Sequence, residues 1–449
     1  MKRSAWRYLF TAEDIRKKLL ITFLLLVLYR LAANVPVPGV DREVIRAIFS
    51  NQSGATGTLL QLFDLLSGGT LSNFSILAMG VYPYITAQII IQLLVPIIPA
   101  LERRLKDNPR EGQKWMERWT IIGTVPMALL SAIGQVNIFN QMTGGGSVLT
   151  FTFGLTAQSW LPTITLILSM MAGTMLGIWL GQLISEFGIP NQGLSLIIFA
   201  GIVARIPSNL LRLAADQQYW WLIFIILIIL ALTIFAIVFV TQGRRNVPVL
   251  FPGRRVGSRM SMPVKSSLPL MVNMAGMIPL IFAQSILTFP AILAGFFINN
   301  KVEAVQTFAM GVYNFFNNSN LWYALLYFIM VVLFTFFYTD VLFANQNYGD
   351  TLKKQGAQIP GVLRGEATQK YLTRVQRRIT MPGALFLGFV AVLPYILAAV
   401  LPGGAAQSAG LFLISSSGLL IVVGVVKDTF NIIEAELRLH GYEESLIKG

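Results

Sequence analysis

Two apolar pieces of unequal length follow each other in this chain, and their order constrains the fold more than any other feature. The first covers residues 59–66 and the second residues 75–96, with the turn Ser67-Gly68-Gly69-Thr70 after the first. A helix needs about 20 apolar residues to cross a bilayer, so the second piece is long enough and the first is not. The pattern is typical of a segment that enters the membrane region and turns back.

The short piece, residues 59–66, has two interpretations. A half-inserted helix ends where lipid offers no partners to its free backbone groups, so other helices must enclose it around a central cavity. Alternatively, the piece is an amphipathic helix that lies on the membrane surface. The pattern alone leaves both interpretations open.

The composition indicates a membrane protein and excludes several kinds of catalysis. Hydrophobic residues make up 55% of the 449 residues and charged residues 12%, whereas soluble domains carry about 25% charged residues. Cysteine is absent and His440 is the single histidine, which excludes disulfides, thiol nucleophiles and histidine-based catalysis. The sequence also contains no catalytic triad, carboxylate pair or nucleotide-binding loop. We therefore expect no enzyme activity, no cofactor and no metal site.

Ten segments of the chain are candidates for membrane spans. The first ends at Arg30 and the prolines that follow rather than at a small-residue cleavage site, so we expect no cleavable signal peptide. Pro269, Pro279 and Pro290 interrupt the seventh segment. The predicted spans lie at about 19–35, 75–96, 119–136, 161–184, 193–211, 220–240, 268–293, 321–342, 381–401 and 411–426.

Basic residues concentrate on one side of this arrangement, and the net charge is +14. Of the 34 lysines and arginines, 25 lie in residues 1–18, 99–118, 242–267 and 344–380. The opposite loops hold only Arg42, Arg46, Arg212 and Lys301. Because cytoplasmic loops are rich in lysine and arginine, both termini are predicted to be cytoplasmic.

The ten spans divide into two halves of five, which must have opposite orientations in the membrane. Inverted repeats often place a functional path where the halves meet, although no repeat is visible in the sequence itself. The predicted parts are a cytoplasmic N-terminal segment (1–18), an N-terminal half (19–211), a C-terminal half (212–430) with cytoplasmic loops 242–267 and 344–380, and a cytoplasmic tail (431–449).

Residues 75–94, SILAMGVYPYITAQIIIQLL, resemble the signature of the SecY family, the channel subunit of the protein-export translocon. The spacing of Gly80, Pro83, Ala87 and Gln92 carries this resemblance. Further matches extend it over nearly the whole chain, at residues 29–39, 268–279, 289–290, 356–366 and 419–423.

The resemblance implies an all-α polytopic membrane protein with ten transmembrane helices, in two inverted five-helix halves, around a central pore with a re-entrant plug helix. The plug is expected at about residues 59–74. Its predicted residues are Leu62, Phe63, Leu65, Leu66, Ser67, Gly68, Gly69 and Leu71.

The resemblance further implies a protein-conducting channel of the plasma (inner) membrane, which translocates unfolded secretory polypeptides and releases membrane segments laterally. The implied partners are SecE-like and SecG-like subunits, the SecA motor, the ribosome, signal sequences and membrane lipids. The alternative is a secondary transporter of a small solute. Such transporters keep ionisable residues within their spans, whereas those of this chain lie near predicted span ends: Arg30, Arg205, Asp340, Lys427 and Asp428.

Six isoleucines are candidates for a pore ring. Two lie four residues apart on the second span and two on the fifth, so each pair shares a helix face. Such stripes usually face lipid or pack in a core, but the resemblance places all six at a hydrophobic constriction. A ring of aliphatic side chains resists wetting, and hence ions, when it is closed. The predicted ring consists of Ile85, Ile89, Ile198, Ile202, Ile281 and Ile421.

The resemblance implies a lateral gate between the second and seventh spans, with Gln92, Asn273 and Phe289. The two amides either hydrogen-bond across the gate, which is worth about 0.6 kcal/mol in a membrane, or satisfy kinked backbone, and both interpretations stay open.

The basic loops are the usual topology signal, but their length also suits a docking surface. The resemblance assigns them to SecA or the ribosome, whose RNA favours basic side chains through its phosphates. The predicted docking residues are Arg244, Arg245, Arg254, Arg255 and Arg364.

Overall fold

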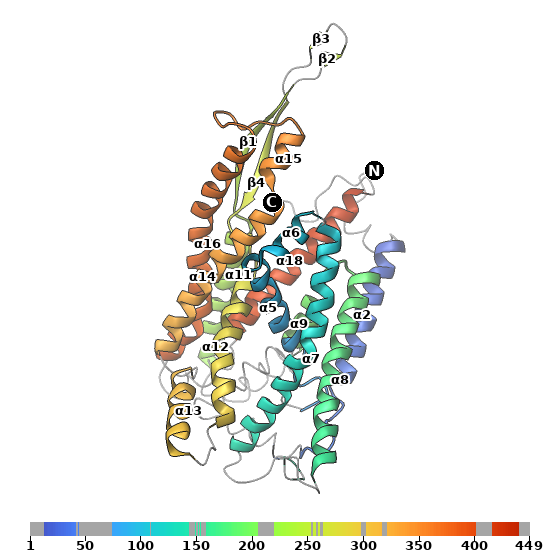
Figure 1. Cartoon of the computed structure of the whole chain (residues 1–449), viewed down its shortest axis with the longest axis vertical. Coiled ribbons are helices and arrows are strands. Elements are labelled where there is room, and N and C mark those ends of the chain that lie inside the picture. Colours follow the sequence, from blue (N-terminus) through green and yellow to red (C-terminus); the bar gives the residue numbers. More distant parts are fainter. Residues whose placement is uncertain are drawn as a thin grey trace.

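The computed structural model shows mostly helices that run side by side, with a β hairpin that projects from one end (Figure 1). The predicted plug residues of 59–73 and Arg254 lie outside the described residues. The described residues are 13–41, 44, 74–107, 109–142, 149, 151, 153, 159–204, 220–252, 255–256, 259–260, 264–297, 302–316, 321–400 and 415–439.

The N-terminal part of the chain contributes six of the described helices. Helix α5 packs against α7, while α2 packs against α8 and α9. The bounds of these helices are α2 (Glu13–Ala32), α5 (Tyr82–Ile97), α6 (Pro99–Asp107), α7 (Pro109–Met142), α8 (Trp160–Phe187) and α9 (Gly193–Val203).

The C-terminal part combines long helices with the hairpin. Helix α14 packs along α16, and α18 contacts α9, α11 and α16. The helices are α11 (Trp220–Gln242), α12 (Ile278–Phe297), α13 (Glu303–Phe315), α14 (Leu321–Gln346), α15 (Tyr348–Lys354), α16 (Glu366–Val400) and α18 (Ser415–Leu439). The strands are β1 (Arg244–Phe251), β2 (Arg255–Val256), β3 (Arg259–Met260) and β4 (Val264–Met271).

The predicted start of the seventh span is wrong. Residues 268–271 belong to β4, which pairs antiparallel with β1, and helix α12 begins only at Ile278. Pro269 fits a two-stranded hairpin because each strand has a free edge. Pro279 fits the first turn of α12, where a missing N–H costs no hydrogen bond. The strict all-α prediction therefore fails at this hairpin.

Three further segments predicted as loops contain helices. The polar 294–320 loop includes α13, and the basic 344–380 loop includes α15 and the first turns of α16. The charged 99–118 segment forms α6 and the start of α7. Helices α6 and α15 and the start of α16 carry many charged residues, and α13 is only 13 residues long, so no long apolar run marks them.

Three helices among the described residues are long and apolar enough to cross a membrane: Glu111–Val136, Trp160–Phe187 and Trp322–Lys354. A fourth candidate is the pair Tyr82–Val95 and Pro99–Leu105, which is bent by 94°. Shorter apolar helices cover Gly193–Val203, Ile228–Gln242 and Ile278–Ala291. The coarse prediction of a mostly helical membrane protein is confirmed, whereas the ten-span layout in two halves stays a prediction.

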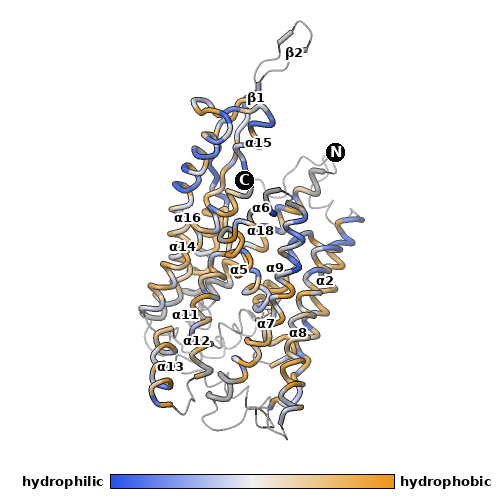
Figure 2. Tube along the Cα trace, viewed as in Figure 1, coloured by the Kyte–Doolittle hydropathy of each residue, from blue (hydrophilic) through white to orange (hydrophobic). Residues whose placement is uncertain are grey.

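The outward side chains of the bundle are apolar, as lipid contact requires. Phe23, Phe235, Phe239 and Trp322 are each at least 70% exposed. Hydrophilic residues gather instead at the end that carries the hairpin, α15 and the start of α16 (Figure 2).

Candidate functional site

Residues 74–80 lie as non-helical backbone inside the bundle, although the sequence predicted a helix from Ser75. The N–H of Val37 donates to the carbonyl oxygen of Phe74 at 3.1 Å, and the N–H of Ile76 donates to that of Val35 at 3.0 Å. Phe74 is 1% exposed and has a positive φ of 40°. Non-helical backbone at membrane depth is tolerated where protein encloses it. The turn that directly follows the predicted plug is enclosed in this way.

Helix α8 approaches this turn so closely that it needs glycine. A Cβ atom added at Gly173 would overlap the carbonyl oxygen of Ile76. One turn further along, a Cβ at Gly177 would already contact Leu77 at 3.5 Å. The sequence reasoning missed these residues, although a glycine at every fourth position is a known signal for close packing in membranes.

The candidate ring isoleucines converge from four helices. Ile198 and Ile202 of α9, Ile281 of α12 and Ile421 of α18 are buried in one hydrophobic cluster, and the half-buried Ile85 of α5 packs against it. Their exposed fractions are 7%, 3%, 8% and 3% for the four buried residues.

The sixth isoleucine, Ile89, occupies a neighbouring cluster with Ala275, Phe282 and Tyr338. Ile85 packs against this cluster as well as against the first. Residues far apart in the sequence therefore meet at one place, between α5, α9, α12 and α18.

The amide groups of the predicted gate do not meet in a hydrogen bond among the described contacts. Asn273 is buried, its Oδ1 accepts the N–H of Gly276 at 2.9 Å, and its Nδ2 donates to the carbonyl oxygen of Gly276 at 3.2 Å. Gln92 Oε1 is buried, and the described part of the chain offers it no hydrogen-bond donor. Asn273 thus stabilises the turn before α12, as the second interpretation required. Phe289 lies on α12 and is 38% exposed.

The two basic loops form one structural unit. Strand β1 pairs with β4 from Arg244↔Met271 to Phe251↔Val264. Leu250 of β1 also exchanges two backbone hydrogen bonds with Gln358, of 2.8 and 2.9 Å. One buried cluster joins the hairpin to α14, α15, α16 and the loop between the last two: Val247, Val249, Leu270, Phe343, Leu352, Ala357, Ile359, Leu372 and Ile379.

Three of the predicted docking arginines have described side chains, and all three are exposed. Arg244 and Arg245 lie on β1, and Arg364 lies in the loop between α15 and α16. Arg255 belongs to β2. The arginines of the two loops, which were predicted separately, therefore lie on one packed unit.

The family model described as SecY matches residues 75–430 of the chain. The chain belongs to the SecY family. SecY translocase subunits of Chlamydia trachomatis and Streptomyces galbus are 35% and 36% identical to it over 98% of its length and 98% and 99% of theirs. The predicted resemblance to the SecY family is thereby confirmed.

Two solved structures share the SecY fold with this chain. One is described as a protein-conducting channel and the other concerns the plug domain of the SecY protein in the closed channel. Their TM-scores are 0.59 and 0.58, at 18% identity, over 96% of this chain and 93% of theirs. At this identity the likeness concerns the fold alone.

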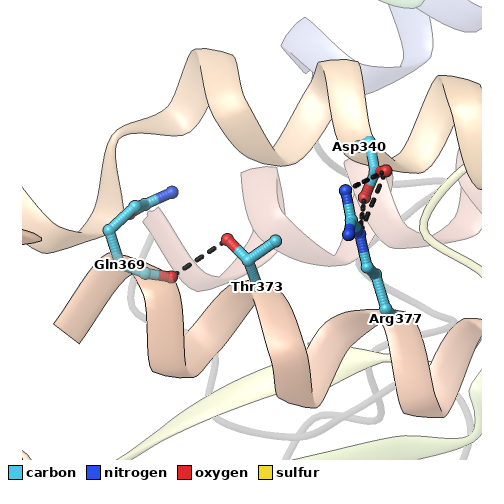
Figure 3. A network of polar contacts seen from close by, with 4 residues as sticks. All are labelled: Asp340, Gln369, Thr373 and Arg377. Carbon is cyan, nitrogen blue, oxygen red and sulfur yellow. Dashed lines mark hydrogen bonds and ion pairs between the residues drawn. The ribbon is translucent and has the colours of Figure 1, made fainter. Parts of the chain in front are cut away.

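In this SecY-family chain an ion pair links α14 to α16 next to the unit that the two basic loops form (Figure 3). Arg377 donates from Nε and Nη2 to the Asp340 carboxylate at 2.9–3.2 Å. The carboxylate raises the pKa of the Arg377 guanidinium above its ordinary value. Both side chains are partly exposed, at 61% and 36%, so solvent screens the pair.

We expect Arg377→Ala to lower the free energy of unfolding by less than about 1 kcal/mol, because exposed ion pairs contribute little. The measurement is the melting temperature of the purified complex, with Arg378→Ala as a neighbouring control. A loss of several degrees relative to that control would show a stronger coupling of the two helices.

Proposed function

We propose that this chain is a protein-conducting channel that translocates unfolded secretory polypeptides across the plasma membrane and releases membrane segments laterally into it. The observation that carries the proposal is that five of the six isoleucines converge in one cluster between α5, α9, α12 and α18, while Ile89 lies in the neighbouring cluster that Ile85 also contacts. Relatives along nearly the full length are named as translocase subunits. The alternative, a small-solute transporter, is not favoured by these relatives.

The chemistry of the ring suits an unfolded polypeptide. Branched aliphatic side chains have no hydrogen-bonding groups, so they slide along any sequence without binding it tightly. When they are buried together in one cluster, as Ile202 and Ile281 are, the constriction stays dry and resists ions. The buried turn at residues 74–80 directly follows the predicted plug and would hold its end in place.

The proposed topology has ten spans in two inverted halves, with both termini in the cytoplasm. The basic unit formed by β1, β4, α15 and the start of α16 would then face the cytoplasm. In Figure 1, α2 begins and α18 ends toward the end of the bundle that carries this unit, which is consistent with that topology.

The proposed partners are SecE-like and SecG-like subunits, SecA, the ribosome and signal sequences. The exposed Arg244, Arg245 and Arg364 support docking, because they project from a packed unit outside the apolar bundle. The chain itself would supply the conduit, and a partner would supply the driving force. The lateral gate is assigned to the seam where α5 contacts α12.

Site-specific crosslinking tests the channel directly, because the chain has no cysteine. Single cysteines at positions 89, 202 and 281 are combined with a stalled secretory chain that carries its own cysteine. We expect disulfide crosslinks at all three positions, and none from the matched lipid-facing position Phe239, which is 72% exposed. Crosslinks only to the cytoplasmic loops would mean that the polypeptide docks without passing through the ring.

A further inference from the structure

The loop between α15 and α16 has one defined shape. Its Gln358 pairs with Leu250 of the hairpin, and its Ile359 is 2% exposed within the cluster that joins both loops. The N–H of Val362 donates to the carbonyl oxygen of Ile359 at 3.1 Å. Gly361 and Gly365 have positive φ angles of 79° and 87°, which fix two sharp turns on either side of the tip.

Leu363 stands at this tip and is 79% exposed, and no large apolar side chain among the described residues is more exposed. Its carbonyl oxygen accepts a hydrogen bond from Thr368 Oγ1 at 2.7 Å, which fixes the backbone that presents it. Other strongly exposed residues, such as Phe235 and Trp322, lie on apolar helices of the bundle, and Phe308 lies on α13. The loop between α15 and α16, which carries Leu363, lies instead at the hydrophilic end of the molecule (Figure 2), so lipid does not explain this exposure.

The surroundings of Leu363 are basic. Arg364 follows it and is exposed, and the exposed Lys353 lies close enough that a Cβ at Gly365 would be 3.6 Å from its Cδ. Glu366 is paired with Lys370 at 2.9 Å, so the nearest carboxylate along the chain is already neutralised. The tip therefore presents one apolar side chain that is surrounded by positively charged side chains.

We infer that Leu363 is the apolar anchor by which this tip selects a protein partner, one whose docking face has an apolar pocket bordered by carboxylates. The inference rests on the proposed function and names the partner class of its docking surface. A central apolar anchor in a pocket with a polar rim is the usual arrangement of a protein interface. RNA is bound through phosphate contacts and through stacking on aromatic or guanidinium groups, and leucine offers neither.

The test uses the full chain in its complex, reconstituted in lipid nanodiscs, with purified SecA and purified ribosomes as probes. Leu363→Gln keeps the size of the side chain and removes its apolar surface, whereas Leu363→Met keeps both. We expect the Kd for SecA to rise at least about tenfold in Leu363→Gln, at low and high salt alike. We expect Leu363→Met to stay within about threefold of the wild type.

Ribosome binding separates the two classes of partner. It should change less than about twofold in Leu363→Gln, whereas Arg364→Ala should weaken it, and more so at low salt. Unchanged SecA binding in Leu363→Gln would overturn the inference, as would an equal loss of ribosome binding. Leu363→Gln and Arg364→Ala must both have the melting temperature of the wild type.

The failure of the proposed function would look different. If wild-type chain bound neither probe, the docking surface itself would be refuted and the inference with it. The crosslinks at the ring isoleucines would still decide separately whether the chain conducts polypeptide.

Discussion

We expect that replacing Ile202 and Ile281 together by asparagine will raise the ion conductance of the resting channel by at least about tenfold. Both side chains are buried, at 3% and 8% exposure, in one hydrophobic cluster to which α9 and α12 contribute. Asparagine is similar in size to isoleucine, but its amide forms hydrogen bonds with water. Water can therefore enter the constriction although the substitution leaves no cavity there. The measurement is the single-channel or macroscopic current of the purified complex in a planar lipid bilayer, without a translocating polypeptide.

Ile237→Asn is the matched control for this experiment. Ile237 is fully buried on α11 in a different cluster, with Leu280 and Tyr327. Because a buried amide without partners costs about 1–3 kcal/mol, the control should destabilise the protein and leave the conductance unchanged. If the double ring variant behaved in the same way as this control, the isoleucines would be ordinary packing residues and the ring would be wrong.

Long apolar runs predicted the long helices well. Predicted residues 161–184 and 220–240 compare with Trp160–Phe187 for α8 and Trp220–Gln242 for α11. These runs end at Gly, Pro and polar residues that break helices, so local chemistry fixes their limits. Helix α16 begins 15 residues earlier than predicted, at Glu366 rather than Met381, because its first turns are charged and a helix can be formed by polar residues too.

The hairpin could not be predicted in the same way. Each residue of β4 is paired with one that lies about 13–27 positions earlier on β1, such as Val264 with Phe251 and Met271 with Arg244. Most of these pairs lie too far apart for a local window of about 11–18 residues. The apolar residues from Leu268 onward therefore looked like the start of a helix, and only the partner strand explains them.

The candidate ring shows a similar limit. Spacing on one helix indicates which isoleucines share a face, but it does not distinguish a pore from packing. The resemblance to SecY supplied the positions, whereas only the tertiary structure shows that these residues come together from four helices. For Asn273 the sequence offered two roles, and the hydrogen bonds to Gly276 at 2.9 and 3.2 Å distinguish them.

Adding one methyl group at Gly173 should disrupt the packing of α8 against the buried turn at residues 74–80. In Gly173→Ala the new Cβ would overlap the carbonyl oxygen of Ile76, which is backbone and cannot rotate away. Overpacking of this kind costs about 1–3 kcal/mol or more. The turn at residues 74–80 must then move, which would also displace the end of the predicted plug. We expect a melting temperature several degrees lower and a higher resting conductance.

Gly311→Ala separates this clash from the general effect of replacing a helical glycine. Gly311 lies within α13, and a Cβ there would meet no atom within 4 Å. Alanine is preferred over glycine in a helix by about 1 kcal/mol, so this variant should be as stable as the wild type or more so. Equal melting temperatures for the two variants would show that α8 moves away from the turn at no cost. A loss confined to Gly173→Ala would instead establish that the glycine face of α8 holds the non-helical turn in place.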